Sequence, residues 1–266
     1  MEALLIEKNI IKMFPPNKQV NYNKQEYYVD CCAKPTYPSG EGKTDIYLRL
    51  KNKNNIEEVK ISIKNTNADF LENKLNSKRA EIIFGENWSN IITNAASSIK
   101  EAFIKKQLYY PEKIGRVSAG SYTMGWRLDI LNKNGGQLSC PVTFTKKQKE
   151  EIFLGTNLPD EKRNGIVFGK VIENCGIANK ILLKAELYQT AQQVLDALIL
   201  IDDYNPDLFL AFKAVNYRSI EDKIDGNRPL AVWIDWSQEK PEIIFDSPLI
   251  FGAKNDILKK FKQRIF

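Results

Sequence analysis

Two stretches of alternating polar and apolar residues lie close together in the first quarter of the chain. The first runs from Asp45 to Leu50 and the second from Glu58 to Asn65, with the turn-like "KNKNN" at 51–55 between them. Alternation with a period of two is typical of strands with one buried face, so this pattern predicts an antiparallel hairpin. Asp45 and Lys64 then both lie at the open end of the hairpin.

Apolar residues at helical spacing predict helices elsewhere along the chain. The predicted helices span residues 2–14, 69–83, 88–108, 181–201 and 256–266. Asp69 is expected to cap the helix over 69–83.

The remaining segments are expected to form strands and loops. The Pro- and Gly-rich "AKPTYPSGEGK" at 33–43 and "PDEKRNG" at 159–165 are typical of loops. The predicted strand regions are 116–144, 207–215, 229–236 and 241–245. This mixture predicts an α/β fold with a central mixed β-sheet flanked by helices, and 266 residues fit one elaborated domain over 1–266.

The composition is that of a globular protein, with 43% hydrophobic and 27% charged residues. A net charge of +6 permits a polyanionic partner without requiring one. No apolar run approaches the roughly 20 residues that cross a bilayer, so we expect a soluble, cytoplasmic protein without a membrane partner.

The chain contains no histidine, and its four cysteines show no C-x-x-C spacing. The absence of histidine excludes Ser-His-Asp and Cys-His triads, a histidine general base and mixed Cys/His zinc sites. The cysteines do not indicate a disulfide framework. Any catalysis therefore depends on carboxylates, lysines, hydroxyls, thiols or a hard metal ion.

The residues at the open end of the hairpin suggest one such chemistry. "KTD" at 43–45, a β-turn and "SIKN" at 62–65 together resemble the catalytic motif of the PD-(D/E)XK nuclease superfamily, especially its type II restriction endonucleases. Asp45 matches the first acid of that motif and Lys64 its lysine. Ser62 departs from the pattern, which has Asp or Glu there, and Thr44 stands where proline is usual. Glu58-Val59-Lys60 on the same strand has the acid-x-lysine spacing of the motif. It is less suitable as the catalytic pair, because Glu58 lies roughly 20 Å along the strand from Lys64.

The resemblance implies a restriction-endonuclease-like core over about 1–110, with a DNA-recognition and sheet-completing region over about 111–266. It also implies catalytic roles for Asp45, Ser62 and Lys64. Mg²⁺ is bound by carboxylate, water and phosphate oxygens, so Asp45 is expected to anchor the ion. A second carboxylate is needed, and Glu41 or Glu7 are the candidates. Lys64 would stabilise charge on the phosphate or orient the attacking water.

The implied activity is Mg²⁺-dependent hydrolysis of double-stranded DNA at a short specific site by a homodimer, as expected of a bacterial or archaeal restriction-modification system. Basic residues on two further segments are candidates for contact with DNA. These are Lys74, Lys78, Arg79, Arg116 and Arg127.

Other interpretations of the same residues stay open. An Asp at the start of a strand is commonly a turn or cap residue, and a Lys at the end of a strand is commonly a solvated charge. The basic residues can likewise form an ordinary solvated surface. The alternative functions are a structure-specific or repair nuclease of the same fold, a DNA-binding protein with an inactive nuclease core, and an unrelated binding protein.

Overall fold

The computed structural model describes residues 2–64, 70–107, 109–115, 117–218, 233–235 and 242–244. The chain divides into two compact units, each built from two separate segments. Unit 1 comprises Met1–Ala68 and Phe144–Pro206, and unit 2 comprises Asp69–Thr143 and Asp207–Phe266. These boundaries differ from the expected division near residue 110, and the single-domain interpretation stays a prediction.

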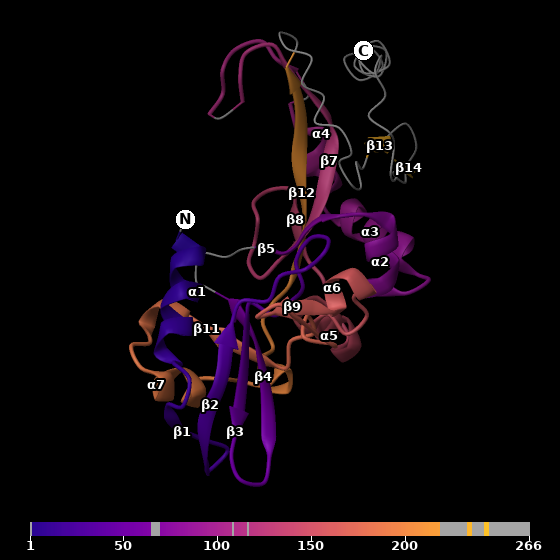
Figure 1. The fold of residues 1–266 in the computed structure, drawn as a ribbon. Helices are drawn as coiled ribbons and strands as arrows, with labels where there is room; N and C mark the ends of the chain where they lie inside the picture. The colour runs from indigo at the N-terminus through magenta and orange to yellow at the C-terminus, as the bar shows by residue number, and fades with distance from the viewer. Residues whose placement is uncertain are drawn as a thin grey trace. The chain divides into compact units, whose positions relative to one another are not determined.

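Unit 1 is built on a five-stranded mixed sheet with the order β1-β2-β3-β4-β11 (Figure 1). Neighbouring strands run antiparallel except for β4 and β11, which are parallel. The strands are β1 (Gln19–Tyr22), β2 (Gln25–Ala33), β3 (Ile46–Lys51), β4 (Ile56–Lys64) and β11 (Lys180–Leu183). The predicted α/β class with a mixed sheet is therefore confirmed, while the restriction-endonuclease-like core stays a prediction.

The predicted hairpin is present as strands β3 and β4. Ile46 pairs with Ile61 and Arg49 with Glu58, so the two strands are in antiparallel register along their length. The turn is held by Asn52, whose side chain accepts hydrogen bonds from two backbone N–H groups within the turn. Local alternation and a polar turn were sufficient to specify this element.

Two helices, α1 (Glu2–Met13) and α7 (Ala191–Asp196), cover one face of this sheet (Figure 1). Ile10 of α1 and Val194 of α7 are buried in the same cluster as Leu48 and Ile61 of the hairpin. The prediction of a helix over 2–14 is confirmed. Burial of these apolar stripes fixes α1, and with it the Glu7 side chain, over the sheet.

The long helix predicted over 181–201 is wrong. Its first residues form β11, in which Ile181 and Leu182 are both fully buried beside β4. A strand that is buried on both faces is continuously apolar and cannot be distinguished from a helix by spacing alone. The α-helical part begins only at Ala191, after its cap Thr190, whose hydroxyl accepts a hydrogen bond from the Gln193 N–H in a capping box.

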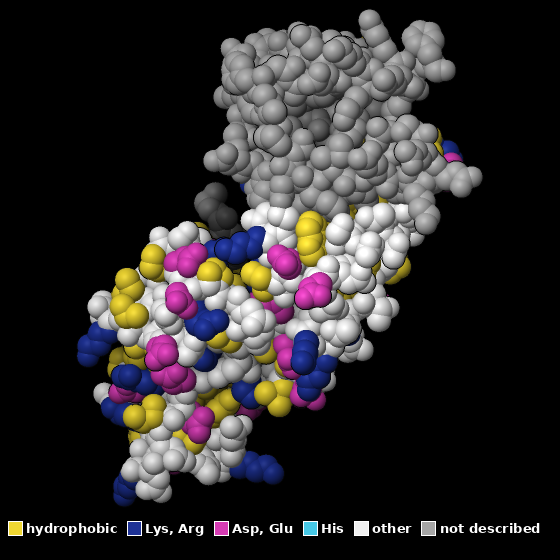
Figure 2. Space-filling model, turned by 90° about the vertical axis from the view of Figure 1, so that its right-hand side faces the viewer, with side chains coloured by type: hydrophobic (Ala, Val, Ile, Leu, Met, Phe, Trp, Pro, Cys, Tyr) yellow, Lys and Arg dark blue, Asp and Glu magenta, His cyan; other side chains and the backbone are white. Residues whose placement is uncertain are grey.

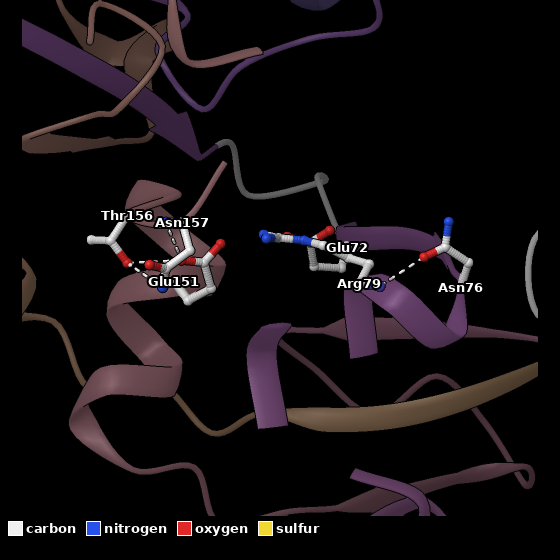
Figure 3. A network of polar contacts seen from close by, with 6 residues as sticks. All are labelled: Glu72, Asn76, Arg79, Glu151, Thr156 and Asn157. Carbon is white, nitrogen blue, oxygen red and sulfur yellow. Dashed lines mark hydrogen bonds and ion pairs between the residues drawn. The ribbon is translucent and has the colours of Figure 1, made fainter. Parts of the chain in front are cut away.

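The second segment of unit 1, Phe144–Pro206, also forms several short helices and strands. α5 is fixed at its end by Glu151, whose carboxylate accepts hydrogen bonds from Thr156 Oγ1 at 2.7 Å and Asn157 N at 2.6 Å (Figure 3). The surface loop predicted over 159–165 contains a short helix in place of irregular chain. These elements are α5 (Lys146–Leu154), α6 (Asp160–Arg163), β9 (Gly165–Val167), β10 (Lys170–Ile172), η1 (Ala185–Leu187) and η2 (Ile201–Asp203).

Unit 2 is a second sheet with helices, in which β5, β7, β12 and β8 pair in that order and β6 also pairs with β7. Its core includes Trp126 and Phe103, whose rings meet edge to face with centroids 5.0 Å apart. The sheet strands are β5 (Phe70–Leu75), β6 (Tyr109–Tyr110), β7 (Ser121–Leu131), β8 (Ser139–Pro141) and β12 (Phe209–Arg218). The remaining elements are the helices α2 (Ser77–Phe84), α3 (Trp88–Ser98) and α4 (Lys100–Ile104), and the strand pair β13 (Trp233–Asp235) and β14 (Glu242–Ile244).

Two helix predictions in unit 2 need correction. Phe70–Leu75 is a strand, and the helix after it begins at Ser77, where the Asn76 side chain accepts the Arg79 N–H. Two register shifts in β5 disturb the alternation that would have indicated a strand. Asp69, the predicted cap, lies outside the described residues. The helix predicted over 88–108 is interrupted at Ile99 and ends at Ile104.

The strand predictions over 116–144 and 207–215 are confirmed by β7, β8 and β12. β13 and β14 lie within the predicted strands at 229–236 and 241–245, while the helix predicted over 256–266 lies outside the described residues. All four cysteines are free thiols. No helix in the described parts of the chain has the length and apolar character needed to cross a membrane.

Candidate active site

The start of β3 and the end of β4 hold Asp45 in a defined place in unit 1. The Asp45 backbone N–H donates to the Ile61 carbonyl at 2.8 Å, and its Oδ2 accepts from the Ile63 N–H at 2.7 Å. Ser62 lies between these two partners. Continuation of the hairpin register therefore sets Asp45 opposite Ser62, one strand away.

The alternation along β4 separates its side chains into two groups. Ile61 and Ile63 pack into the core beneath α1 and α7. Ser62 and Lys64 are therefore directed to the other face of the sheet. Ser62 is completely buried, whereas Lys64 and Asp45 are partly exposed.

A second acidic group approaches from α1. Glu7 is almost completely buried and accepts a hydrogen bond from Lys34 Nζ at 2.7 Å. Lys34 follows β2 directly, at the start of the Pro- and Gly-rich loop that ends at Asp45. This ion pair brings a helix, a strand end and the loop together beside the hairpin. We call Glu7, Lys34, Glu41, Asp45, Ser62 and Lys64 the Asp45 cluster.

Several charged members of the cluster act electrostatically on the Asp45 carboxyl. Burial raises the pKa of the Asp45 carboxyl above its ordinary value, against the opposing effects of the Lys64 charge and the Ile63 N–H. The charge of Glu7 raises this pKa further, and that of Lys34 lowers it. Two carboxylates and two ammonium groups therefore act on each other at one end of the sheet.

Glu41 belongs to the same environment through the loop. Burial alone would lower the pKa of Lys34, but its hydrogen bond to Glu7 and the charges of Glu7, Glu41 and Asp45 raise it overall. Burial raises the pKa of Tyr37, and the charges of Cys175, Asp45 and Glu41 raise it further. Glu41 is itself exposed. The predicted pairing of Asp45 with Glu41 is thus compatible with the fold, as is the alternative with Glu7.

The loop that delivers Asp45 is held by packing against Tyr37. The Tyr37 hydroxyl donates to the Thr44 carbonyl at 3.3 Å. A side chain on Gly42 would meet the Tyr37 ring at 2.7 Å, so only glycine allows this close approach. The position of Asp45 is therefore fixed from the loop as well as from β4.

Two buried hydroxyls next to Asp45 have no hydrogen-bond partner among the described residues. They are Thr44 Oγ1 and Ser62 Oγ, on side chains that are 3% and 0% exposed. An unpaired buried hydroxyl costs free energy that a bound water or ligand oxygen would recover. Such groups beside a partly exposed carboxylate favour a site that takes up water or ligand.

The donor set of the Asp45 cluster fits a hard cation of the Mg²⁺ type. In the residues that the structure describes, no three or more His, Cys, Asp or Glu side chains are grouped so that they could hold a metal ion. Mg²⁺ does not need such a group, since one or two carboxylates with waters and substrate phosphates complete its shell in many enzymes. Asp45 with Glu7 or Glu41 would provide the carboxylates, and Ser62 would provide a neutral oxygen.

Glu58, the acid of the Glu58-Val59-Lys60 sequence, has a separate structural partner. Its Oε1 accepts a hydrogen bond from the Tyr47 hydroxyl at 2.5 Å. It faces Arg49 across the hairpin, far along β4 from Lys64. Glu58 therefore has a structural contact of its own on the hairpin, and the choice of Ser62 as the motif position stays a prediction.

The residues predicted to contact DNA have different surroundings. Lys74 and Lys78 are exposed, as a DNA contact requires. Arg79 forms an ion pair of 2.7 Å with Glu72, and both side chains are largely buried (Figure 3). Arg127 donates from Nε to the buried carboxylate of Asp129 at 3.1 Å. Arg116 lies outside the described residues.

The face drawn in Figure 2 shows no continuous patch of Lys and Arg side chains over the described residues. Lys and Arg side chains alternate there with Asp, Glu and hydrophobic side chains over the described residues. Attraction of a polyanion by a broad positive field is therefore not evident on this face.

Sequence reasoning missed two residues of this region, Lys34 and Tyr37. Both lie in a loop whose composition indicated only a turn-rich connection. Their proximity to Asp45 arises from the pairing of β2 with β3 and from the packing of α1, which a local pattern does not encode. No motif or residue spacing singled them out, because the strand that precedes Lys34 was itself not predicted.

Searches against protein-family models, curated proteins and solved structures find no match to this chain. The Asp45 cluster therefore has to be interpreted from its own chemistry.

Proposed function

We propose that the chain is a Mg²⁺-dependent deoxyribonuclease that hydrolyses both strands of double-stranded DNA at a short specific site, as a type II restriction endonuclease does. The observation that carries this proposal is the Asp45 cluster. It joins a partly exposed carboxylate to Lys64, a partly buried Glu7–Lys34 ion pair and a buried hydroxyl without a described partner. Carboxylates for a hard cation beside a lysine for phosphate are the groups that phosphodiester hydrolysis requires.

Each side chain then has a defined role. Asp45 would hold the ion, with Glu7 or Glu41 as the second acidic group. Bound Mg²⁺ would supply Lewis-acid activation of the phosphate and of water. Lys64 stabilises the negative charge that develops on the phosphate and orients the attacking water. Ser62 donates to or accepts from a water at the site, and Lys34 holds Glu7 in position.

We further propose that the protein acts on DNA as a homodimer in the cytoplasm of a bacterium or archaeon. A two-fold symmetric protein matches a palindromic DNA site, which explains why such enzymes pair. Sedimentation of the purified protein with and without a short duplex would measure its oligomeric state.

A non-catalytic DNA-binding protein is the second candidate. This candidate is favoured by Ser62, which stands where the PD-(D/E)XK nucleases have an acid. It is also favoured because the described residues contain no group of three or more acidic, histidine or cysteine side chains that could hold a metal ion. A structure-specific or repair nuclease would use the same cluster on a different DNA substrate.

Incubation of the purified protein with unmethylated bacteriophage DNA, with Mg²⁺ or with EDTA, tests the proposal. Discrete fragments that form only with Mg²⁺ would support site-specific cleavage. A smear would indicate a less specific nuclease of the same chemistry. DNA that remains intact with both Mg²⁺ and Mn²⁺ would contradict the proposal and favour the non-catalytic candidate.

A further inference from the structure

Unit 2 contains an exposed aromatic ring with two cations within about 6 Å of it. Phe70 begins the edge strand β5 and is 43% exposed. The Arg127 guanidinium carbon lies 5.8 Å from the centroid of its ring, and Lys213 Nζ lies 6.0 Å from it. We call Phe70, Arg127 and Lys213 the Phe70 cluster.

The two cations are held in place by the sheet. Arg127 of β7 and Lys213 of β12 pair directly across the two strands. Arg127 is fixed by Asp129, a fully buried carboxylate that also accepts the Lys74 N–H at 2.8 Å. Lys213 Nζ donates to the Gly135 carbonyl at 3.1 Å. The cluster is therefore organised by the fold before any ligand is present.

Both cations keep donors for a ligand after these contacts. A guanidinium has five N–H donors and an ammonium has three. Within the described part of the chain, the contacts above use one donor of Arg127 and one of Lys213. Because the carboxylate that balances Arg127 is completely buried, the accessible part of the cluster is positive and aromatic.

A nucleotide has the complementary chemistry. An exposed ring provides a surface for stacking of an unpaired base, and neighbouring cations bind its phosphates. A base inside a duplex is already stacked on both faces, so the ring favours an unpaired nucleotide. A purely apolar or acidic protein segment would use either the ring or the cations, but not this combination.

We propose that the Phe70 cluster is a stacking site for an unpaired nucleotide, by which unit 2 binds single-stranded DNA. The choice of DNA as the polymer rests on the proposed nuclease function. The site itself follows from the ring, the two cations and the buried Asp129 that positions them.

Binding of a fluorescein-labelled single-stranded oligothymidine and of a matched duplex, measured by anisotropy in EDTA, tests this site without cleavage. We expect Phe70→Ala to weaken single-strand binding about tenfold, the usual effect of removing one stacked base contact. Phe70→Trp should retain binding because it keeps the stacking surface. Tyr28→Ala is the matched control, since Tyr28 is a similarly exposed strand aromatic in unit 1, at 41%.

Salt dependence provides a second readout. Lys213→Gln should reduce the slope of log K against log salt for the single strand by about 0.7, as expected for the loss of one phosphate contact. Circular dichroism of each variant checks that the fold is retained. Equal binding by Phe70→Ala and wild type, equal loss in Phe70→Ala and Tyr28→Ala, or no single-strand binding by the wild type would overturn the inference.

The outcome is separable from that of the nuclease proposal. A protein that cleaves DNA but binds single strands independently of Phe70 would refute the stacking site alone. A protein that binds single strands through Phe70 but never cleaves would retain the site and refute the nuclease activity.

Discussion

Asp45 in unit 1 and Asp129 in unit 2 are two carboxylates whose pKa is raised by burial, yet they have different surroundings. Asp129 is fully enclosed, and its oxygens accept the Lys74 N–H and the Arg127 Nε–H. Asp45 is partly exposed, accepts a bond from the Ile63 N–H, and lies beside buried hydroxyls without described partners. A carboxylate whose bonds are satisfied by protein stabilises a fold, whereas one that keeps capacity for further ligands can do chemistry.

Among the residues around the two carboxylates, the largest effect is expected for Lys64, whose charge acts on Asp45. Lys64→Ala should lower the rate of Mg²⁺-dependent DNA cleavage by about 10²–10³-fold, because it removes charge stabilisation in the transition state. DNA binding should remain largely intact. Lys60→Ala is the control, since Lys60 shares the face of β4 and donates to the Asn174 carbonyl at 3.0 Å. Equal losses of rate in both variants would remove the special role of Lys64.

For Asp129 the expected effect is on stability. Asp129→Ala should lower the free energy of unfolding by about 3 kcal/mol, because it leaves Arg127 and the Lys74 N–H without their buried acceptor. Urea unfolding followed by tryptophan fluorescence measures this change. A loss comparable to that of a surface ion pair would show that Asp129 is not the anchor that the structure indicates.

Ser62 gives a smaller effect that separates activity from stability. Ser62→Ala should reduce cleavage about tenfold if its hydroxyl holds a water at the site, while the stability changes little because the hydroxyl has no described partner. Ser121→Ala is the matched control, since Ser121 in unit 2 is also buried with an unpartnered hydroxyl among the described residues. Unchanged cleavage by Ser62→Ala would exclude Ser62 from the mechanism.

The smallest effect concerns Asp30 of β2 in unit 1. Hydrogen bonds from Lys51 and Arg49 lower the pKa of Asp30. Because this pKa is lower in the folded chain, the stabilisation is complete above the unfolded value of about 3.9 and is lost as the pH falls through the folded value. Asp30→Asn should therefore cost about 0.5 kcal/mol at neutral pH, in the range of partly exposed ion pairs.

Unfolding of Asp30→Asn and wild type across a pH series measures this difference. The two stabilities should converge in acid. A gap that persists or widens at pH values below the folded pKa of Asp30 would contradict the ion-pair assignment.

The sequence predicted those parts of the fold that local pattern determines. The hairpin of β3 and β4 follows from alternation and a polar turn, and it placed Asp45 and Lys64 at one end. The helix predicted over 181–201 failed because Ile181 and Leu182 are buried in a parallel strand, where continuous apolar residues imitate a helix.

The candidate site was predictable to the same extent. Asp45, Ser62 and Lys64 are brought together by one hairpin, so a single motif identified them. Lys34 belongs to the Asp45 cluster through its ion pair with Glu7, and that contact depends on how α1 packs over the sheet. The anchoring of Arg127 by Asp129 likewise requires the folded β7.

Cleavage of plasmid DNA by Asp45→Asn and wild type, purified in parallel and assayed with Mg²⁺, tests the central claim most directly. Glu58→Gln serves as the control, because Glu58 is an acid on the same hairpin with its own structural partner, Tyr47. We expect cleavage by the wild type and Glu58→Gln, and none above background by Asp45→Asn. Full activity of Asp45→Asn would contradict the assignment of Asp45 as the catalytic carboxylate.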